Sequence, residues 1–529
     1  MNKIFAGLLL CSLPLAVGAQ ETFDALQMSQ TELRGTSRFQ SMAGAFGALG
    51  GDISTLTQNP GGIGVYRNSD ANITLSLDFN GSKTPLYKDN DTRFNVNSVG
   101  YVGTIKTHSE TMPYFNIGIS YNRLMDFHRH YRGGITGNIK NSVTNHIAAY
   151  TGNYTEGDLL ATNDYNPYYE SSAPWASILS YNSYLMNYNN GAWQGLLGDG
   201  TTGNAEYEVD QKGHADEYNI SFGGNVNEFL FWGATVGITD LDYDSYMYYG
   251  ESLSKAYIYN YTKDDGTIEL GSADLGYTNY LNTRGTGYNF KLGVILKPVS
   301  QLRLGFAFHT PTYYDLKDLY KTYASAGFTQ ADGVLYEVEN STGSGDYFDE
   351  VRYDIHTPWR FIGSIAGVIG RQGLISFDYE YVGNSTIRVC DDGGREYIET
   401  TGNIKNSLQA SHIFRLGGEY RLTPNWSLRA GYSYQSSPVK SEVKDNQMNI
   451  ATVSVNPAYE FNNDVQYVTC GVGYHYKNFY FDAAYVHKNR SSDYHAFSPM
   501  VGYGNYDAGV YQEVKDNDNR VSMTFGFRF

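Results

Sequence analysis

The residues that could carry chemistry are few and scattered in this chain of 529 residues. The cysteines are Cys11, Cys390 and Cys470, and their spacing matches no thiol redox motif and no zinc motif. The 11 histidines form neither an HExxH pattern nor a cluster, so no metal and no cofactor is expected. None of them accompanies a serine in a recognisable nucleophile motif. The sequence therefore predicts that the protein is not an enzyme.

Charge and composition exclude two further classes. Lys and Arg total 38 against 55 Asp and Glu, a formal net charge of −17, and this acidity argues against nucleic acid as a partner. Past the N-terminus no run approaches 18 uncharged apolar residues, which excludes a helical membrane protein. The chain is instead rich in Tyr (49) and Gly (58), a composition that fits strands joined by polar loops.

The first residues read as a secretory signal. A short cationic start at Lys3 precedes an apolar stretch, and the small residues before Gln20 predict a signal peptide over 1–19 with cleavage after Ala19. Cys11 could suggest a lipid anchor, but the bulky Leu10 before it argues against lipidation. After cleavage only Cys390 and Cys470 remain, and we expect two separate thiols.

Alternating segments fill the chain from residue 70 onward. At 301–310 the apolar face consists of Leu302, Leu304, Phe306 and Phe308, and small or charged residues form the other face. This pattern predicts fourteen strands, near 70–82, 93–107, 113–127, 214–226, 228–248, 284–297, 300–313, 349–367, 371–384, 408–422, 425–436, 463–476, 477–489 and 517–529.

The connections between these segments alternate strictly between short and long. All short turns then lie at one end and all long loops at the other, which is the asymmetry of outer-membrane barrels. The predicted fold is all-β: a 14-stranded antiparallel transmembrane β-barrel over 70–529, whose largest loop is 128–213. A secreted sandwich or propeller is the alternative, but a sandwich would not sort its connections by length and a propeller would repeat a blade motif.

The end of the chain supports the barrel. The last strand terminates in Phe529 after an alternating run of aromatic residues, which resembles the signal read by the barrel-assembly machinery, an expected partner together with outer-membrane lipid and lipopolysaccharide. With the apolar face toward lipid, the lumen receives charges such as Lys291, Arg303, Arg415 and Arg429. We expect a monomer in the outer membrane of a Gram-negative bacterium, with both termini periplasmic.

Residues 20–69 do not alternate. They are rich in small and apolar residues, and Asn59-Pro60-Gly61 predicts a turn because Pro60 fixes its own φ and biases Asn59 away from helix. A plug inside the barrel suits this composition, whereas a periplasmic tail so apolar would be poorly solvated. If φ at Gly61 is negative, we expect Gly61→Ala to be tolerated.

The segment Arg38–Gly64 resembles the N-terminal hatch of the FadL/TodX family of outer-membrane transporters of hydrophobic compounds. Its run Ser41–Ala48 is similar to the family's small-residue run, and Asn59-Pro60-Gly61 stands where the family carries Asn-Pro-Ala. The resemblance implies a hatch over 20–69 inside a 14-stranded barrel, and it places the hatch turn in the lumen. Gly61 departs from the family's usual Ala.

The resemblance also implies a function: passive uptake of hydrophobic solutes such as long-chain fatty acids, by capture in an apolar pocket and lateral release through the barrel wall. An acyl tail would lie among Phe39, Met42, Phe46 and Leu49, with its carboxylate near Arg38 or a lumen arginine. The same apolar side chains could equally serve only to anchor the plug.

A gap in the wall would require an interrupted strand. The third strand is the one that the family bends, and there Asn116, Gly118 and Asn122 are the candidate residues. Two alternatives to transport of hydrophobic solutes remain open. One is a general diffusion porin, and the other is an adhesin or receptor barrel that binds through the Tyr-rich loop 128–213.

Overall fold

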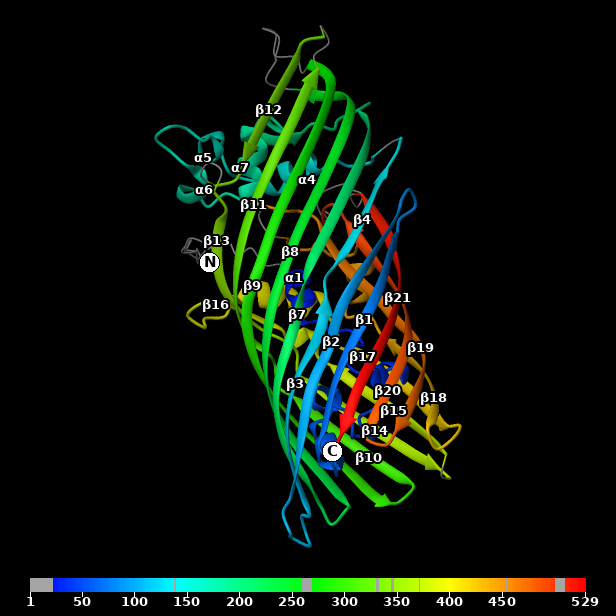
Figure 1. Ribbon diagram of the computed structural model, residues 1–529. Coiled ribbons are helices and arrows are strands. Elements are labelled where there is room, and N and C mark those ends of the chain that lie inside the picture. Colours follow the sequence, from blue (N-terminus) through cyan, green and yellow to red (C-terminus); the bar gives the residue numbers. More distant parts are fainter. Residues whose placement is uncertain are drawn as a thin grey trace, which may run out of the picture.

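The computed structural model describes residues 22–137, 139–189, 191–258, 269–329, 333–343, 347–370, 372–452, 455–499 and 510–529. The expected signal peptide and its cleavage site lie outside these residues. Fourteen antiparallel strands form one closed barrel, in which the last strand pairs with the first, Arg528 opposite Asp70 (Figure 1). The predicted fold class is confirmed.

The barrel strands have the following bounds: β1 Asp70–Lys83, β2 Lys88–Lys106, β3 Tyr114–Asp126, β7 Thr202–Val226, β8 Leu230–Ile258, β9 Glu269–Val299, β10 Leu302–His309, β14 Arg360–Ile369, β15 Gly373–Val382, β17 Ser411–Arg421, β18 Trp426–Gln435, β19 Tyr459–Tyr476, β20 Phe479–His495 and β21 Tyr511–Arg528. Each strand pairs with its neighbours in this order. Short turns gather at one end of the barrel, called here the turn end, and long connections gather at the loop end (Figure 1).

Several strands are longer than the sequence pattern predicts. β8 and β9 extend well past the predicted limits 248 and 284, and they stay paired up to Ile258 opposite Glu269. The alternation of apolar residues ends where the lipid ends, but main-chain hydrogen bonding continues beyond that level. Apolar periodicity therefore marks only the lipid-facing part of each strand.

Two prolines divide segments that were predicted as single strands. β10 ends before Pro311 and continues as β11 (Tyr313–Thr329), while Pro358 separates β13 (Asp349–His356) from β14. Proline has no amide hydrogen for the ladder, so the pairing stops and resumes beyond it. Above these breaks β11 and β13 pair with each other, and the further strands are β4 Arg129–Ile135, β12 Leu335–Ser341 and β16 Arg388–Asp391.

A helical subdomain, residues 139–197, covers one side of the loop end (Figure 1). It contains α4 Val143–Thr151, α5 Glu156–Leu159, α6 Pro167–Glu170, α7 Trp175–Asn182, β5 Met186–Asn189 and β6 Ala192–Gly195. Its buried side chains, among them Ile147, Ile178 and Leu179, pack in one core with the inner face of the extended wall, for example Tyr277. The predicted long loop thus contains a folded subdomain, termed here the helical cap.

The segment before β1 lies inside the barrel. It comprises α1 Thr22–Ser29, α2 Ser37–Ser41, α3 Thr55–Gln58 and η1 Pro60–Val65. Two short helices and one 3₁₀ helix occur among the loops, α8 Ile398–Ser407, α9 Ser441–Lys444 and η2 Asn384–Thr386. Among the described residues, no helix is both long and apolar enough to cross a bilayer.

The apolar faces of the barrel strands point outward. On β21 Met523, Phe525 and Phe527 are exposed, and the side chains between them, including Ser522 and Thr524, are buried inside. The lumen is therefore polar apart from the plug, as the predicted alternation requires. Cys390 is buried, Cys470 is exposed, and both are free thiols.

Candidate functional site

The hatch turn fastens the plug to the barrel wall. Asn59 Oδ1 accepts a hydrogen bond from Gly61 N at 3.0 Å, and the same side chain donates to Val294 O of β9 at 3.3 Å. It also donates to Gly47 O within the plug. Pro60 begins η1, where its missing N–H leaves no unpaired donor. A single amide thus joins two parts of the plug and the wall.

Glycines on the wall make this close contact possible. Gly233 and Gly293 face each other across the β8–β9 ladder, and a methyl group at either would overlap Pro60 O or Asn59 Oδ1. Gly61 itself is not in a left-handed conformation, yet a Cβ there would lie 2.8 Å from Val294 Cα. The expectation that a negative φ makes Gly61→Ala tolerable is wrong, because backbone packing rather than φ excludes a side chain.

The five candidate substrate-binding residues lie at the interface of plug and wall. Phe39, Met42, Phe46 and Leu49 are buried in one cluster, and Phe39 stacks at an angle on Phe46 with 5.5 Å between ring centroids. Arg38 Nε lies 3.1 Å from Glu419 of β17 and is also positioned over the Phe46 ring. Of these residues, Phe39 borders a cavity of about 150 Å³ beside the plug, and Arg38 and Leu49 border a separate cavity at the turn end.

The three wall-gap candidates have separate environments. Asn116 donates to Ile63 O of the plug at 2.8 Å, and Gly118 lies where Leu56 and Ile63 approach the wall. Both residues are paired with β2 and with β7, so the strand is continuous at these two positions. Asn122 differs, because its pair with Ser98 is the last one between β2 and β3.

Beyond that pair the wall contains a seam, defined here as the space between β2 residues 88–97 and the end of β3. In the described part of the chain, residues 88–97 pair only with β1, and β4 pairs only with β7. A register shift in each strand marks the divergence, at Asn97 in β2 and at Leu124 in β3. Side chains bridge the seam instead of main chain, as where Arg123 donates to Asn95 Oδ1 at 2.7 Å.

Plug residues 32–34 cover the seam from inside. Glu32 N donates to Leu124 O at 2.8 Å, which satisfies the carbonyl that the bulge frees. Arg34 donates to Asn97 Oδ1 at 3.0 Å and lies 3.5 Å from Asp126, so it contacts both sides of the seam. These polar contacts of the plug thus link the two diverging strands.

Three cavities surround residues 23–34. The charged cavity, about 120 Å³, and the inner cavity, about 150 Å³, share Gln30, Glu32 and Arg34 in their linings. The aromatic cavity, about 80 Å³, shares Phe23 and Gln27 with the charged one. These plug residues therefore separate the three cavities from one another.

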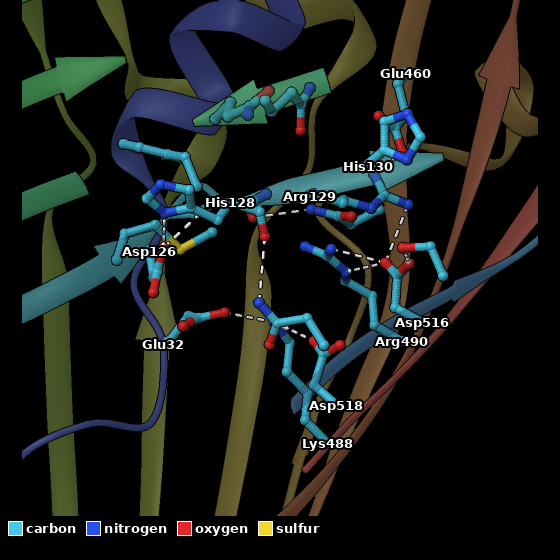
Figure 2. Close-up of a pocket in the computed structure, with 18 of the residues that line it drawn as sticks. Glu32, Asp126, His128, Arg129, His130, Glu460, Lys488, Arg490, Asp516 and Asp518 are labelled. Atoms are coloured by element: carbon cyan, nitrogen blue, oxygen red, sulfur yellow. Dashed lines mark hydrogen bonds and ion pairs between the residues drawn. The ribbon is translucent and has the colours of Figure 1, made fainter. Parts of the chain in front are cut away.

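Ion pairs line the charged cavity (Figure 2). Arg129 and Arg490 both point toward Asp516, at 3.0 Å and 2.7 Å, and Lys488 joins Glu32 of the plug at 2.5 Å. Such buried charges require partners, and here nearly every charge has one. The described residues contain no group of three or more His, Cys, Asp or Glu arranged to hold a metal ion.

The aromatic cavity lies toward the loop end, next to α1. Its lining combines ring faces and aliphatic groups, namely Phe23, Tyr243, Met247, Leu281, Tyr320, Val455, Ala458 and Tyr459. Phe23 stacks on Tyr459 with 5.4 Å between ring centroids. Polar side chains, among them Asp24 and Glu460, complete the lining. The residues of this cavity were not among those that the sequence singled out. The only sequence signal for these residues is the high aromatic content of the chain.

Burial perturbs two groups at the helical cap. Glu251, on the loop-end extension of β8, accepts hydrogen bonds from Val143 N at 2.8 Å and from Ser142 Oγ at 2.5 Å. Burial raises the pKa of this carboxyl to about 7 despite those donors. Burial likewise lowers the pKa of His146 in α4 to about 3, so this imidazole stays neutral.

Comparison with known proteins gives the family. Residues 231–513, more than half of the chain, match the family described as outer membrane protein transport protein (OMPP1/FadL/TodX). The chain belongs to this family. Its members are outer-membrane transport channels and not enzymes. The resemblance to this family and the prediction that the protein is not an enzyme are therefore both confirmed. A search of the curated proteins gives no match.

One solved structure supports the fold, and two further channels show a weaker likeness. A Pseudomonas aeruginosa FadL homologue superposes with a TM-score of 0.51 at 13% identity, covering 95% of this chain and 100% of that one. The Ralstonia pickettii toluene transporter TbuX gives 0.45 at 14% identity, covering 94% and 99%. The Pseudomonas putida toluene transporter TodX gives 0.45 at 12% identity, covering 95% and 100%. At 13% identity, the likeness to the Pseudomonas aeruginosa homologue concerns the fold alone.

Proposed function

We propose that this FadL/TodX family member takes up hydrophobic solutes, such as long-chain fatty acids or toluene, and releases them sideways through the seam. The observation that carries the proposal is the loss of β2–β3 pairing above Ser98 and Asn122, with cavities directly behind it. Unpaired main chain at the lipid boundary is costly unless something covers it, so an opening there has a function.

Capture would begin in the aromatic cavity. Its rings and the Met247 thioether offer apolar surface, and burial of such surface contributes about 25 cal/mol per Å². A solute leaving this cavity meets Phe23 and Gln27 of α1, and displacement of these side chains would admit it to the charged and inner cavities. Movement of residues 23–34 is thus the proposed gate.

The inner cavity offers a site for an acidic head group. Arg360 and Arg415 share one carboxylate, Glu380, at 3.2 Å and 2.7 Å, so the three groups carry a net positive charge. Arg415 Nη1 is buried without a hydrogen-bond partner among the described residues. A solute carboxylate would satisfy that donor. The hatch cluster of Phe39, Met42, Phe46 and Leu49 remains the predicted site for an acyl tail.

We also infer the arrangement of the protein in the membrane. After removal of residues 1–19, the turn end, where β21 ends, faces the periplasm, and the helical cap faces the outside. The described chain begins with α1 inside the barrel, beside the aromatic cavity toward the loop end, so only the C-terminus is proposed to lie at the periplasmic end. The protein acts as a monomer that the barrel-assembly machinery inserts through the strand ending at Phe529. Residues 20–69 serve as the hatch, with the turn Asn59-Pro60-Gly61 as its attachment point to the wall.

A reversible cross-link across the seam tests lateral release. In a background with Cys390→Ser and Cys470→Ser, Asn95→Cys and Arg123→Cys would be joined by a reducible bifunctional thiol reagent. We expect cells that lack other such transporters to lose uptake of a labelled long-chain fatty acid and of labelled toluene, and to regain it after reduction.

A matched control uses Tyr485→Cys and Val521→Cys, which face each other on the outer side of the continuous β20–β21 ladder. Cross-linking there should leave uptake unchanged. Undiminished uptake with the seam closed would mean that the solute leaves by another route.

The charged cavity favours one alternative, passive diffusion of polar solutes. Its lining of paired Arg, Lys, Asp and Glu side chains accommodates water and small ions rather than hydrocarbon (Figure 2). Swelling of liposomes in sugar solutions distinguishes the two functions. A hydrophobic-solute transporter with its plug in place should give no swelling above that of empty liposomes.

A further inference from the structure

A fourth cavity opens at the turn end, away from the seam and from residues 23–34. It has a volume of about 340 Å³ and lies between the plug residues 49–51 and 65–68 and the inner wall of the barrel. Four arginines line it, Arg38, Arg67, Arg303 and Arg528. This space is termed here the arginine cavity.

Three of the four arginines have a carboxylate partner: Arg38 with Glu419 at 3.1 Å, Arg67 with Glu228 at 2.7 Å and Arg528 with Asp70 at 2.8 Å. Arg303, on β10, has none among the described residues. Its guanidinium donates to Leu49 O at 2.6 Å, and its Nε is buried without a partner. The cavity is therefore lined by one guanidinium without a carboxylate partner among the described residues, and a buried charge of this kind is costly in the absence of an anion.

Besides Tyr66, Asn68 and two glycines, the lining includes four aliphatic side chains. Leu49 and Val65 come from the plug, while Val368 and Leu374 come from the ends of β14 and β15. A small inorganic anion would pair with the guanidinium but leave these side chains against water. An anion that carries a short hydrocarbon chain would satisfy both parts of the lining.

We propose that the arginine cavity is a binding site for an amphiphilic oxyanion, with its head group on Arg303 and its chain against Leu49 and Val368. A bound molecule would touch the plug on one side and β10 and β14 on the other. Occupancy would therefore hold the plug against the wall at the turn end. The site needs neither the seam nor the inner cavity, so it stands apart from the proposed transport route.

Calorimetric titration of the full processed chain in an uncharged detergent tests the site, with hexyl phosphate as the probe. Arg303→Gln should weaken binding at least tenfold. Arg421→Gln is the matched control, because Arg421 lies exposed at the same end of the barrel and does not line the cavity, and it should bind as the unmodified protein does. Equal binding by Arg303→Gln would overturn the proposal.

Two further probes distinguish the contribution of the charged head group to binding from that of the hydrocarbon chain. Inorganic phosphate lacks the chain and hexanol lacks the charge, and each should bind at least tenfold more weakly than hexyl phosphate. Equal affinity for either would also overturn the proposal.

A second variant tests the site independently, in case Arg303→Gln fails to fold. Val368→Glu places a carboxylate beside Arg303 and supplies the missing counterion within the cavity. It should abolish hexyl phosphate binding while keeping or raising the unfolding temperature. Retained binding in this variant would show that the anion binds elsewhere.

Discussion

The buried carboxyl of Glu251 makes the stability of the helical cap depend on pH. Glu251 is 2% exposed and accepts hydrogen bonds from Ser142 and Val143, which join β8 to the start of α4, and from Tyr249 within β8. Burial outweighs these donors and raises its pKa from 4.5 to about 7. Between these two pH values the folded cap keeps a proton that the unfolded segment releases.

The sign of the effect follows from that difference in proton binding. Stability falls with pH wherever the folded state binds more protons than the unfolded state. The contribution of the protonated carboxyl is complete below pH 4.5 and is lost as the pH rises through 7. A shift of this size corresponds to about 3 kcal/mol, or roughly a hundredfold in the equilibrium between the closed and the locally open cap.

Amide hydrogen exchange of peptides within 139–189 measures this equilibrium at pH 5 and pH 7.5, after correction for intrinsic exchange rates. We expect lower protection at pH 7.5 in the unmodified protein. Glu251→Gln keeps the shape and an acceptor oxygen but cannot ionise, so its protection should be nearly independent of pH.

Glu206→Gln is the matched control, since Glu206 is an exposed carboxyl on the neighbouring extension of β7. It should behave like the unmodified protein. The reasoning is refuted if Glu251→Gln retains the full pH dependence, or if protection in the unmodified protein rises with pH.

Three further changes test the plug and its supports. Arg429→Met should lower the heating temperature at which the barrel unfolds in SDS more than it lowers uptake, because it leaves Asp482 buried without its partner at 2.5 Å, a loss of about 3–5 kcal/mol. Asn59→Ala with Pro60→Ala should alter labelled fatty-acid uptake while the barrel stays resistant to SDS; normal uptake would contradict a gating role for the turn. Gly61→Ala should displace the plug, at a cost of about 1–3 kcal/mol, and make liposomes permeable to sugars, and an unchanged permeability would count against the packing argument.

The barrel could be predicted from the sequence because lipid imposes a rule on every strand that crosses it. Apolar residues such as Phe525 and Phe527 must alternate with lumen residues, and connections must differ between the two ends. Strand residues that lie outside the lipid need not alternate in this way. The extensions of β8 and β9 are held together by main-chain pairing, and Tyr, Asp, Ser and Gly follow one another in them without a fixed order. No apolar periodicity therefore indicates where these strands end.

The site depended on contacts that one sequence does not reveal. The pair of Glu32 with Lys488 joins residues 456 positions apart, and both are common residue types in polar loops. The aromatic cavity likewise draws Phe23, Tyr243 and Tyr459 from distant segments. Residue type could identify aromatic and charged candidates, but the barrel closure decides which of them meet.

The seam illustrates the same limit at the level of the main chain. Glycine in a strand suggests a bulge, and on that basis Gly118 was a candidate for the gap. The register shifts fall instead at Asn97 and Leu124, residues with no intrinsic preference for a bulge. What permits the divergence is the plug, because Glu32 N and Arg34 supply the hydrogen bonds that the neighbouring strand no longer provides. A plug that replaces strand pairing by its own main-chain and side-chain hydrogen bonds could restore or release the wall without unfolding the barrel, and this is the physical basis of the gate proposed at that position.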